Sequence, residues 1–158
     1  MKRTGEVPAF EEAVVPHYRG LVRRLTAVLD DREAAMGMAQ EAHLRAYRSW
    51  GRFDGIDARA WLYTIGLRLA FNERRRRLRW SRVLGRQDDE PPWVAAEDRG
   101  LHEALRRLRR EHRAALLLNV VDGYTQSEVA EMLGVAPGTV ASWVSRAKTQ
   151  MREVLTDA

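Results

Sequence analysis

The sequence predicts an all-α fold, with two small helical domains joined by a flexible acidic linker and a helix-turn-helix in the C-terminal domain. Three observations predict this architecture. Apolar residues recur at three- and four-residue spacing along most of the chain. No stretch shows the period-two alternation of a half-buried strand. Residues 81–98 lack a helical period and combine Pro91-Pro92 with an acidic cluster, which is typical of a linker.

The N-terminal domain is predicted at residues 8–80 as three helices. The first runs from Phe10 to Leu29 and is kinked or divided at Pro16, because proline interrupts the helical hydrogen-bond ladder. The second runs from Arg32 to about Trp50. The third runs from Ala58 to about Trp80, with Asp57 as its N-cap. The second helix is expected to bury Ala35, Met38, Ala39, Ala42 and Ala46. The third is expected to bury Trp61, Leu62, Ile65, Leu69 and Phe71 or Asn72.

Two polar features flank the third helix. The segment from Gly51 to Asp57 has two glycines and several turn-favouring residues, so it is predicted to be a loop. The helix ends in the arginine-rich run Arg74 to Arg79, whose cations lie on several helical faces at once. This pattern favours a ridge that binds phosphates. The alternative is a helix end whose negative dipole is complemented by cations, which requires only one or two of them.

The C-terminal domain is predicted at residues 99–156. It begins with one or two helices, which end at Asp122-Gly123. Their expected apolar positions are Leu101, Leu105, Leu108, Ala115, Leu116, Leu117 and Val120. Thr125 followed by Glu128 forms a capping box that predicts the start of the next helix. Gly134 can end that helix in the left-handed conformation, and Pro137 suits the first turn of another. This spacing predicts a helix-turn-helix.

The helix from Pro137 to about Arg152 is expected to have two unlike faces. One face is apolar, with Val140, Val144, Ala147 and Met151. The opposite face is small, polar and partly cationic, with Ala141, Ser142, Ser145, Arg146 and Thr149. Such a face fits a major groove, where Arg146 and Lys148 would contact phosphates and Ser142 or Ser145 base edges. The alternative is a helical hairpin whose polar face is simply solvated.

The charge distribution also favours a polyanionic partner. Of the 158 residues, 27 are Lys or Arg and 22 are Asp or Glu. Residues 1–80 hold 16 basic against 10 acidic residues, residues 81–98 hold 2 against 5, and residues 99–158 hold 9 against 7. Two basic blocks therefore flank an acidic joint. Nucleic acid is the expected partner, although solvated helix faces also explain such excesses.

Several function classes are disfavoured by what the sequence lacks. It has no cysteine, which excludes disulfides and thiolate chemistry. No apolar run approaches the roughly 20 residues of a membrane span, and the start of the chain lacks the apolar core of a signal peptide, so a cytoplasmic protein without membrane insertion is expected. The four histidines show no helical metal-ligand spacing, and no phosphate loop or nucleophile elbow is present. We therefore expect neither an enzyme nor a bound cofactor or metal.

The motifs resemble those of extracytoplasmic-function (ECF) sigma factors of bacterial RNA polymerase. The residues that carry the resemblance are Gln40-Glu41-Ala42 with Leu44-Arg45-Ala46-Tyr47, Trp61-Leu62-Tyr63-Thr64-Ile65, and Leu133-Gly134-Val135 with Gly138-Thr139-Val140. Residues 8–80 resemble the promoter-melting domain, known as region 2, and residues 99–156 resemble region 4, which binds the upstream promoter element. The resemblance covers nearly all of residues 10–155, in the family's order.

The resemblance implies a role for each part. Region 2 would dock on the β′ clamp of RNA polymerase core through Met38, Gln40, Glu41 and Arg45. Its loop and third helix would hold a flipped base and the melted minus-10 strand through Phe53, Asp54, Ile56, Asp57, Arg59, Trp61, Asn72, Arg75, Arg76 and Arg77. Region 4 would contact the β flap and read the minus-35 element through Thr139, Ala141, Ser142, Ser145, Arg146 and Lys148. An anti-sigma factor or another protein regulator is a further expected partner.

The sequence also departs from the family pattern at three sites, one of which is His43, where an apolar aromatic residue is common. The turn Ala35 to Met38 is apolar where acidic residues are usual, and Ala141 and Trp143 stand where the family has cations. Two functions therefore stay open. The favoured one is a sigma factor that directs promoter-specific initiation by recognising the minus-35 and minus-10 elements and aiding DNA melting. The alternative is a degenerate sigma-like regulatory protein that binds a protein partner without opening promoters. An ordinary helix-turn-helix repressor is a weaker third, because a dimerisation domain needs neither the arginine ridge nor the tryptophans.

Overall fold

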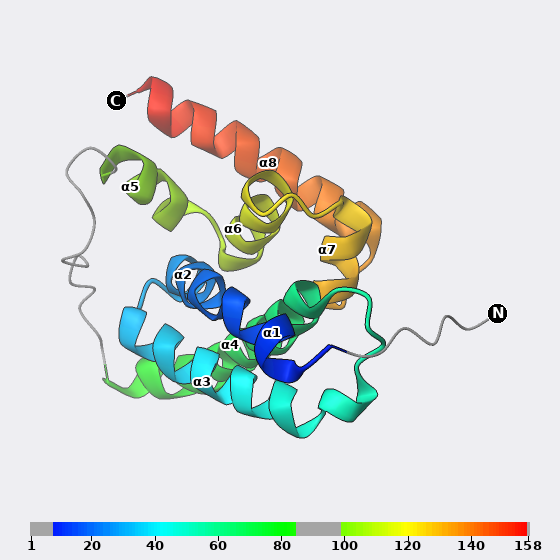
Figure 1. Cartoon of the computed structure of the whole chain (residues 1–158). Coiled ribbons are helices and arrows are strands. Elements are labelled where there is room, and N and C mark those ends of the chain that lie inside the picture. The colour runs from blue at the N-terminus through cyan, green and yellow to red at the C-terminus, as the bar shows by residue number, and fades with distance from the viewer. Residues whose placement is uncertain (1–7, 85–98, 158) are drawn as a thin grey trace. The chain divides into compact units, whose positions relative to one another are not determined.

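The computed structural model describes residues 8–84 and 99–157, and within these ranges the side chains of residues 73–84 are not described. All regular elements in the described ranges are helical, which confirms the predicted all-α class. The chain forms two compact units, Met1–Gly85 and Arg86–Ala158. Figure 1 shows the helices of each unit in chain order.

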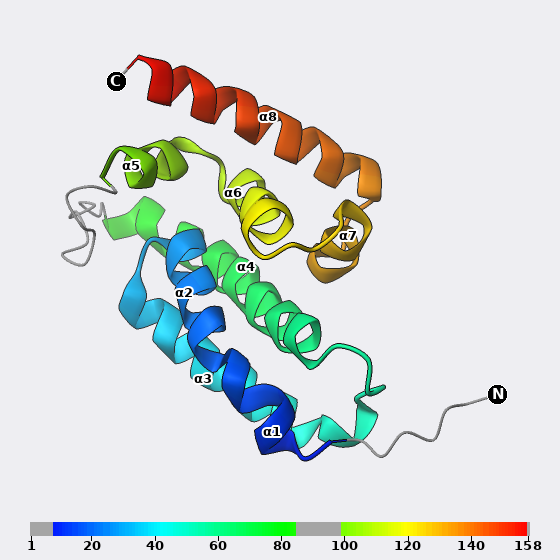
Figure 2. The same ribbon diagram turned by 45° about the horizontal axis from the view of Figure 1, so that its top comes forward.

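The N-terminal unit is a bundle of three main helices, α2, α3 and α4, preceded by a short helix. Its elements are α1 (Phe10–Val14), η1 (Val15–His17), α2 (Tyr18–Leu29), α3 (Arg32–Arg48), η2 (Trp50–Arg52) and α4 (Ala58–Leu84). Helix α2 packs on both α3 and α4, and α3 packs on α4, as Figure 2 shows from a second direction. The predicted division at Pro16 is confirmed, because this residue lies in the 3₁₀ turn η1 between two α-helices.

The corner between α2 and α3 depends on two aspartates. Asp30 takes a left-handed conformation with φ of 57°, which ends α2. Asp31 is the N-cap of α3, and its Oδ1 accepts a hydrogen bond of 2.9 Å from the backbone N–H of Ala34. Asx side chains suit both positions, because they tolerate the left-handed region and satisfy free N–H groups. Helix α3 ends at Arg48, two positions before the predicted Trp50.

The core of this unit combines leucines from α2 and α4 with alanines from α3. Leu21, Leu25 and Leu62 are fully buried. The alanine prediction is confirmed, since Ala35, Ala39, Ala42 and Ala46 have no exposed surface. The prediction for Met38 was wrong, because its side chain is only half-buried. The alanines form the whole buried stripe of α3, so the neighbouring helices can approach closely.

The predicted core stripe of α4 is confirmed at Leu62 and wrong at its other positions, including Trp61, which is half-buried. The stripe that is buried consists of Leu62, Tyr63, Gly66, Leu67 and Ala70. Ile65, Leu69 and Phe71 are half-buried, and Asn72 is exposed. The physical reason is the close approach of α2: Tyr63 lies against Gly20, and Gly66 lies against Leu21. Because Gly20 and Gly66 have no side chain, α2 and α4 can approach closely, and the side of α4 that carries Gly66 faces α2.

The C-terminal unit is built around one long helix. Its elements are α5 (Arg99–Arg107), α6 (Arg110–Leu116), the π-helical turn η4 (Leu117–Val121), α7 (Gln126–Leu133) and α8 (Pro137–Thr156). Helix α8 packs on α5, α6 and α7, as Figure 2 shows. The core is made of small and branched residues: Ala104, Leu108, Ala114, Leu118, Val129, Val140, Val144 and Ala147. The predictions that Leu101 and Val120 are buried were wrong, because they are 48% and 54% exposed.

The boundaries between the units differ in part from the prediction. Helix α4 continues to Leu84, so the predicted linker at 81–98 begins with helical residues; its remainder, 85–98, lies outside the described residues. The break predicted at Asp122-Gly123 is present, with Gly123 at a φ of 80°. In the part of the chain that is described, no helix has both the length and the apolar character needed to cross a bilayer.

Candidate nucleic-acid interface

The two ends of α7 and the start of α8 have the local structure predicted from Thr125, Gly134 and Pro137. The capping box is complete: Thr125 Oγ1 accepts from the backbone N–H of Glu128 at 3.1 Å, and Glu128 Oε2 accepts from the N–H of Thr125 at 2.7 Å. Gly134 ends α7 in the left-handed conformation, with φ of 69°. Pro137 occupies the first turn of α8, where no partner for an N–H is needed. A short turn therefore fixes the entry of α8.

Helix α8 presents a polar face opposite its buried stripe. Val140, Val144 and Ala147 are buried and Met151 is half-buried, as predicted. Thr139 and Ala141 are half-buried, at the edges of the polar face. The predicted contacts that are exposed are Ser142, Ser145, Arg146 and Lys148. Two of them are small and polar and two are cationic, a combination that suits contact with bases and phosphates in a DNA groove.

Trp143 has a different place from the one its sequence position suggests. It lies on the flank of α8 that faces α6, and its ring centroid is 6.1 Å from that of His112. Trp143 is half-buried and His112 is only 7% exposed. The indole is therefore partly a packing residue at the α6–α8 contact. The sequence did not predict this packing role, because Trp143 was considered only as a position at which the family has a cation.

Burial and two neighbouring cations favour the neutral form of His112 within this contact. Burial lowers the pKa of His112 below its ordinary value, and the neighbouring Arg109 and Arg146 cations lower it further. Glu111 acts in the opposite direction. A neutral imidazole can pack on Trp143 without bringing another positive charge next to Arg146. The α6–α8 contact is thus formed by the uncharged histidine.

In the N-terminal unit, an aromatic cluster supports the loop before α4. The rings of Trp50 and Phe53 are stacked, with centroids 4.6 Å apart and an interplanar angle of 14°. Trp61 lies tilted against both, at 5.7 Å from Trp50 and 5.3 Å from Phe53. Phe53 is only 7% exposed, so its ring forms the floor under the loop and presents little surface of its own. Trp50 and Trp61 remain half-buried at its border.

The loop itself is held by its two aspartates. Asp54 Oδ1 accepts from the N–H of Ile56 at 3.0 Å, across Gly55 with its φ of 82°. Asp57 Oδ1 accepts from the N–H of Ala60 at 2.8 Å, which confirms Asp57 as the cap of α4. Ile56 at the loop tip is 84% exposed. The carboxylates therefore shape the backbone, while Ile56 is the side chain that the loop presents.

Arg59 extends this region along the first turn of α4. Its guanidinium carbon lies 5.1 Å from the centroid of the Tyr63 ring, a cation–π arrangement. Burial lowers the pKa of His17, the Arg59 cation lowers it further, and Asp57 opposes the shift. Asn72 is exposed about three turns beyond Trp61 of the aromatic cluster. The predicted contacts Arg75, Arg76 and Arg77 belong to α4, but their side chains lie outside the described residues.

The outer face of α3 carries both polar and apolar groups. Arg45 Nε donates to Glu41 Oε1 at 2.6 Å, an exposed pair one helical turn apart, and Gln40 is exposed beside it. An apolar stripe accompanies these residues, with Met36 and Leu44 each 41% exposed and Tyr47 60% exposed. Sequence reasoning missed Leu44 and Tyr47 as surface residues, although their spacing from Gln40 places them on its face.

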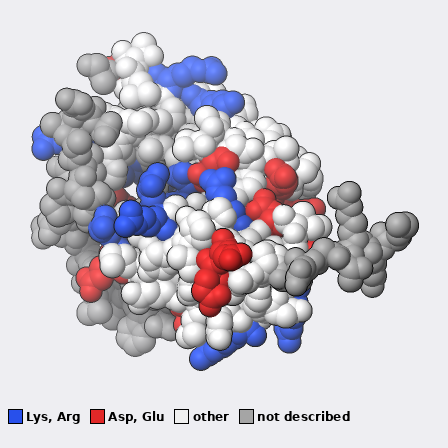
Figure 3. Space-filling view, viewed as in Figure 1, with Lys and Arg blue, Asp and Glu red and all other residues white. Residues whose placement is uncertain are grey.

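Charged side chains are distributed in groups over the described surface. Figure 3 shows several separate groups of Lys and Arg with groups of Asp and Glu among them on the face in view. Among the described residues there is no cluster of three or more His, Cys, Asp or Glu that could hold a metal ion.

Comparisons with known proteins identify both units. The sigma-70 region 2 family matches residues 12–80, and the sigma-70 region 4 family matches residues 98–151. The RNA polymerase sigma factor CarQ of Myxococcus xanthus is 29% identical over 161 residues, covering 97% of this chain and 92% of that protein. The ECF RNA polymerase sigma factor SigL of Mycobacterium tuberculosis is 32% identical over 174 residues, covering 98% and 96%.

The fold is shared with solved structures. One example is the sigma factor RpoE in complex with the anti-sigma factor NepR from Bartonella quintana, with a TM-score of 0.81 and 23% identity over 93% of this chain and 96% of that one. The two family matches together span most of the described residues, in the order region 2 and then region 4. The chain belongs to the ECF sigma factor family of bacterial RNA polymerase.

Proposed function

We propose that this chain binds RNA polymerase core and directs it to a defined class of promoters, through separate contacts of its two units with the minus-10 and minus-35 elements. The observation that carries the proposal is the exposed face of α8, where Ser142, Ser145 and Arg146 project opposite a buried valine stripe. Cationic and small polar groups at this spacing can contact phosphates and base edges together. The capped turn before Pro137 supports a fixed presentation of that face.

The N-terminal unit would hold melted DNA at the loop from Phe53 to Asp57. Unpaired bases bind by stacking on aromatic rings beside cations, and Trp50, Trp61 and Arg59 provide such a border. Taking a base out of the duplex costs on the order of a few kcal/mol, which contacts in the receiving site must offset. We assign Ile56 to contact with the flipped base and Phe53 to support of the loop. Asn72 and Arg75 to Arg77 would continue the track along α4.

The outer face of α3 is the proposed docking site for the β′ clamp. Gln40 with the Glu41–Arg45 pair supplies polar contacts, and half-buried Met38 lies at their border. The stripe of Met36, Leu44 and Tyr47 adds apolar surface of the kind that protein partners cover. The same stripe suits the alternative function, in which a protein partner binds but promoters are not opened. The two functions therefore share this docking surface and differ in whether promoter DNA is opened after docking.

Promoter selection of this kind needs no catalytic residues, cofactor or metal from the chain. We propose that it acts in the cytoplasm, associated with the nucleoid when it is engaged with polymerase, and that region 4 contacts the β flap. An anti-sigma factor or another protein regulator is the expected controlling partner. A related fold has been solved in complex with an anti-sigma factor, which supports this class of partner.

Reconstitution with purified core RNA polymerase tests the proposal. The chain should co-elute with core on gel filtration and support initiation from its own or a closely linked promoter. Arg146→Ala should reduce binding of promoter duplex, whereas the matched exposed control on the same helix, Arg152→Ala, should have a smaller effect. Failure to co-elute would refute the proposal. Co-elution without thymine reactivity to permanganate at any promoter would favour the alternative, a partner-binding protein.

A further inference from the structure

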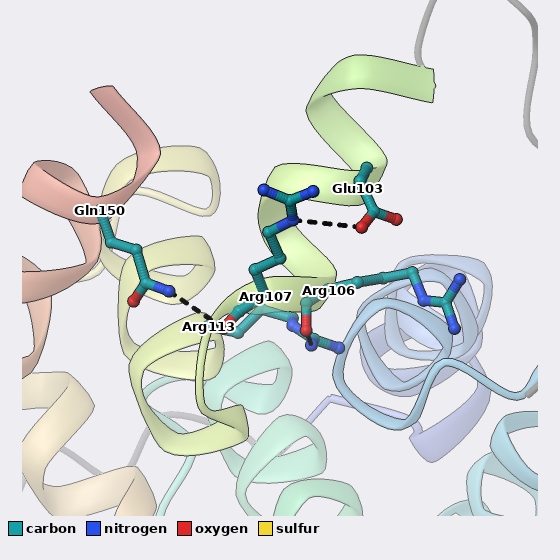
Figure 4. A network of polar contacts seen from close by, with 5 residues as sticks. All are labelled: Glu103, Arg106, Arg107, Arg113 and Gln150. Atoms are coloured by element: carbon teal, nitrogen blue, oxygen red, sulfur yellow. Dashed lines mark hydrogen bonds and ion pairs between the residues drawn. The ribbon is translucent and has the colours of Figure 1, made fainter. Parts of the chain in front are cut away.

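The end of helix α5 is held by a buried arginine from the next helix. Arg113, in α6, is only 4% exposed. Its Nε donates to the carbonyl oxygen of Leu105 at 2.7 Å, and its Nη2 donates to those of Arg106 and Leu108 at 2.9 and 3.3 Å. Figure 4 shows the guanidinium beneath the last turn of α5. One side chain thus donates to two carbonyl groups in the last turn of α5, those of Leu105 and Arg106, and to that of Leu108 directly after the helix.

Helix α8 completes the same cluster. Gln150 Nε2 donates to the carbonyl oxygen of Arg107 at 3.1 Å, although the two residues are 43 positions apart in the chain. The consecutive carbonyls from Leu105 to Leu108 therefore all accept hydrogen bonds from outside the α5 ladder. The positive charge of Arg113 also complements the negative end of the α5 dipole. This cluster joins α5, α6 and α8 at one point.

Its position along α8 gives it a further consequence. The short turn before Pro137 holds the first end of α8, and Gln150 lies 13 residues later, about 20 Å along the helix. Ser142, Ser145 and Arg146 lie between these two points. Between the two points α8 packs on α6 and α7 through its apolar stripe, and the hydrogen bond from Gln150 adds a directional contact to this packing. The α5 end is therefore a second support for the DNA-facing segment.

We propose that Arg113 and Gln150 are positioning residues for promoter recognition: Arg113 fixes the end of α5, and Gln150 anchors α8 to it, so that the polar face of α8 keeps its orientation to the groove. The proposal rests on the proposed function of α8 in reading the minus-35 element. It assigns sequence discrimination, in part, to two residues that do not touch DNA.

The first test measures sequence discrimination. A duplex is selected from a randomised pool by the wild-type chain bound to core RNA polymerase, and the same duplex with its upstream block scrambled is the reference. Gln150→Met keeps the shape but removes the donor, and it should lower the ratio of the two affinities by about threefold to tenfold, the range of one lost hydrogen bond. Gln150→Lys keeps a donor and should restore the ratio. Gln126→Met, on the exposed first turn of α7, is the control.

The ratio separates positioning from other effects of the substitutions. The charge added by Gln150→Lys changes phosphate attraction for both duplexes alike, so the ratio is insensitive to it. A loss of folded protein likewise lowers both affinities by one factor. Arg113→Lys keeps the charge but loses the planar fork that reaches several carbonyls, so it should lower the ratio without rescue. If Arg113→Lys does not fold, the comparison of Gln150→Met with Gln150→Lys tests the proposal without it.

The second test uses the free protein. Amide hydrogen exchange in α8 should be faster in Gln150→Met than in the wild type or Gln126→Met, with α7 unchanged. Unchanged exchange in α8 would overturn the proposal. Faster exchange with an unchanged affinity ratio would also overturn it, since the cluster would then only stabilise the fold. If the wild-type chain itself prefers no duplex, the proposed function fails, and that result is visible before any variant is made.

Discussion

Leu21 of α2 lies so close to Gly66 of α4 that a Cβ atom at position 66 would come within 2.7 Å of Leu21 Cδ1. Leu21 is fully buried and has little room to move aside. The helix crossing in the N-terminal unit therefore depends on the missing side chain at Gly66.

Gly66→Ala should consequently destabilise the protein, although alanine is the better helix former. The helical preference contributes about 1 kcal/mol in favour of alanine, whereas overpacking of a buried site costs about 1–3 kcal/mol. The net loss in free energy of unfolding should be about 1 kcal/mol, measured by urea denaturation. Gly37→Ala is the matched control, because a Cβ there would meet nothing within 4 Å, and it should stabilise α3. A stabilised Gly66→Ala variant would contradict the crossing described here.

The contact between Leu21 and Gly66 also explains why most of the buried stripe of α4 could not be predicted from the sequence. Helix α4 is apolar around much of its circumference, so Trp61, Ile65 and Leu69 formed as good a stripe as Leu62, Gly66 and Leu67. The choice between the two stripes is made by the close approach of α2, which a single helix cannot reveal. In α8 the apolar positions occupy a narrower arc. The burial of Val140, Val144 and Ala147 could therefore be predicted from spacing alone.

Helix ends were predictable for a different reason. Thr125, Gly134 and Pro137 act through their own backbone geometry, so their roles are visible in a short window of sequence. The buried cation and the neutral histidine of α6 were not predictable in this way. The run from Arg106 to Arg113 contains five arginines, and only the position of the α5 carbonyls decides that Arg113 is the buried one.

The neutral state of His112 predicts a dependence of stability on pH. Its pKa in the folded chain is lowered from the ordinary 6.5, so the unfolded chain binds more protons in this range. The contribution of His112 to stability is complete above pH 6.5, and it should decline as the pH falls toward the lower folded value. His17 acts in the same direction.

Urea denaturation between pH 7.5 and pH 5 measures this effect. His112→Gln should make the free energy of unfolding less dependent on pH, because it removes one of the two titrating histidines. His17→Gln should remove the contribution of the other. The chain has five tryptophans, so the signal of Trp143 is the part of the pH-dependent fluorescence quenching that is present in the wild type and absent in His112→Gln. A stability that rises as the pH falls through 6.5 would contradict the direction of both shifts.

The polar face of α8 predicts a gain of DNA affinity from a single added cation. Ala141 is half-buried at the edge of this face and stands where the family has a cation, so Ala141→Lys can reach a phosphate with its long side chain. Each new phosphate contact should steepen the slope of log affinity against log salt by about 0.9. Trp143→Arg should fail to bring the same gain, because it removes the contact with His112 and places a cation near Arg146. Titration of a promoter duplex at several salt concentrations compares the two variants.

Two substitutions in the loop before α4 should distinguish the role of Ile56 in promoter opening from the role of Phe53 in stability. Ile56 is 84% exposed, so Ile56→Ala should change the free energy of unfolding by less than about 0.5 kcal/mol. If Ile56 contacts the flipped base, the same variant should still form closed complexes but show weaker permanganate reactivity of promoter thymines. Phe53→Ala removes a buried ring that stacks on Trp50, which costs about 3–5 kcal/mol in other cores. It should therefore lower stability and promoter opening together. An Ile56→Ala variant that opens promoters as the wild type does would leave the aromatic border, and not the loop tip, as the surface that receives the base.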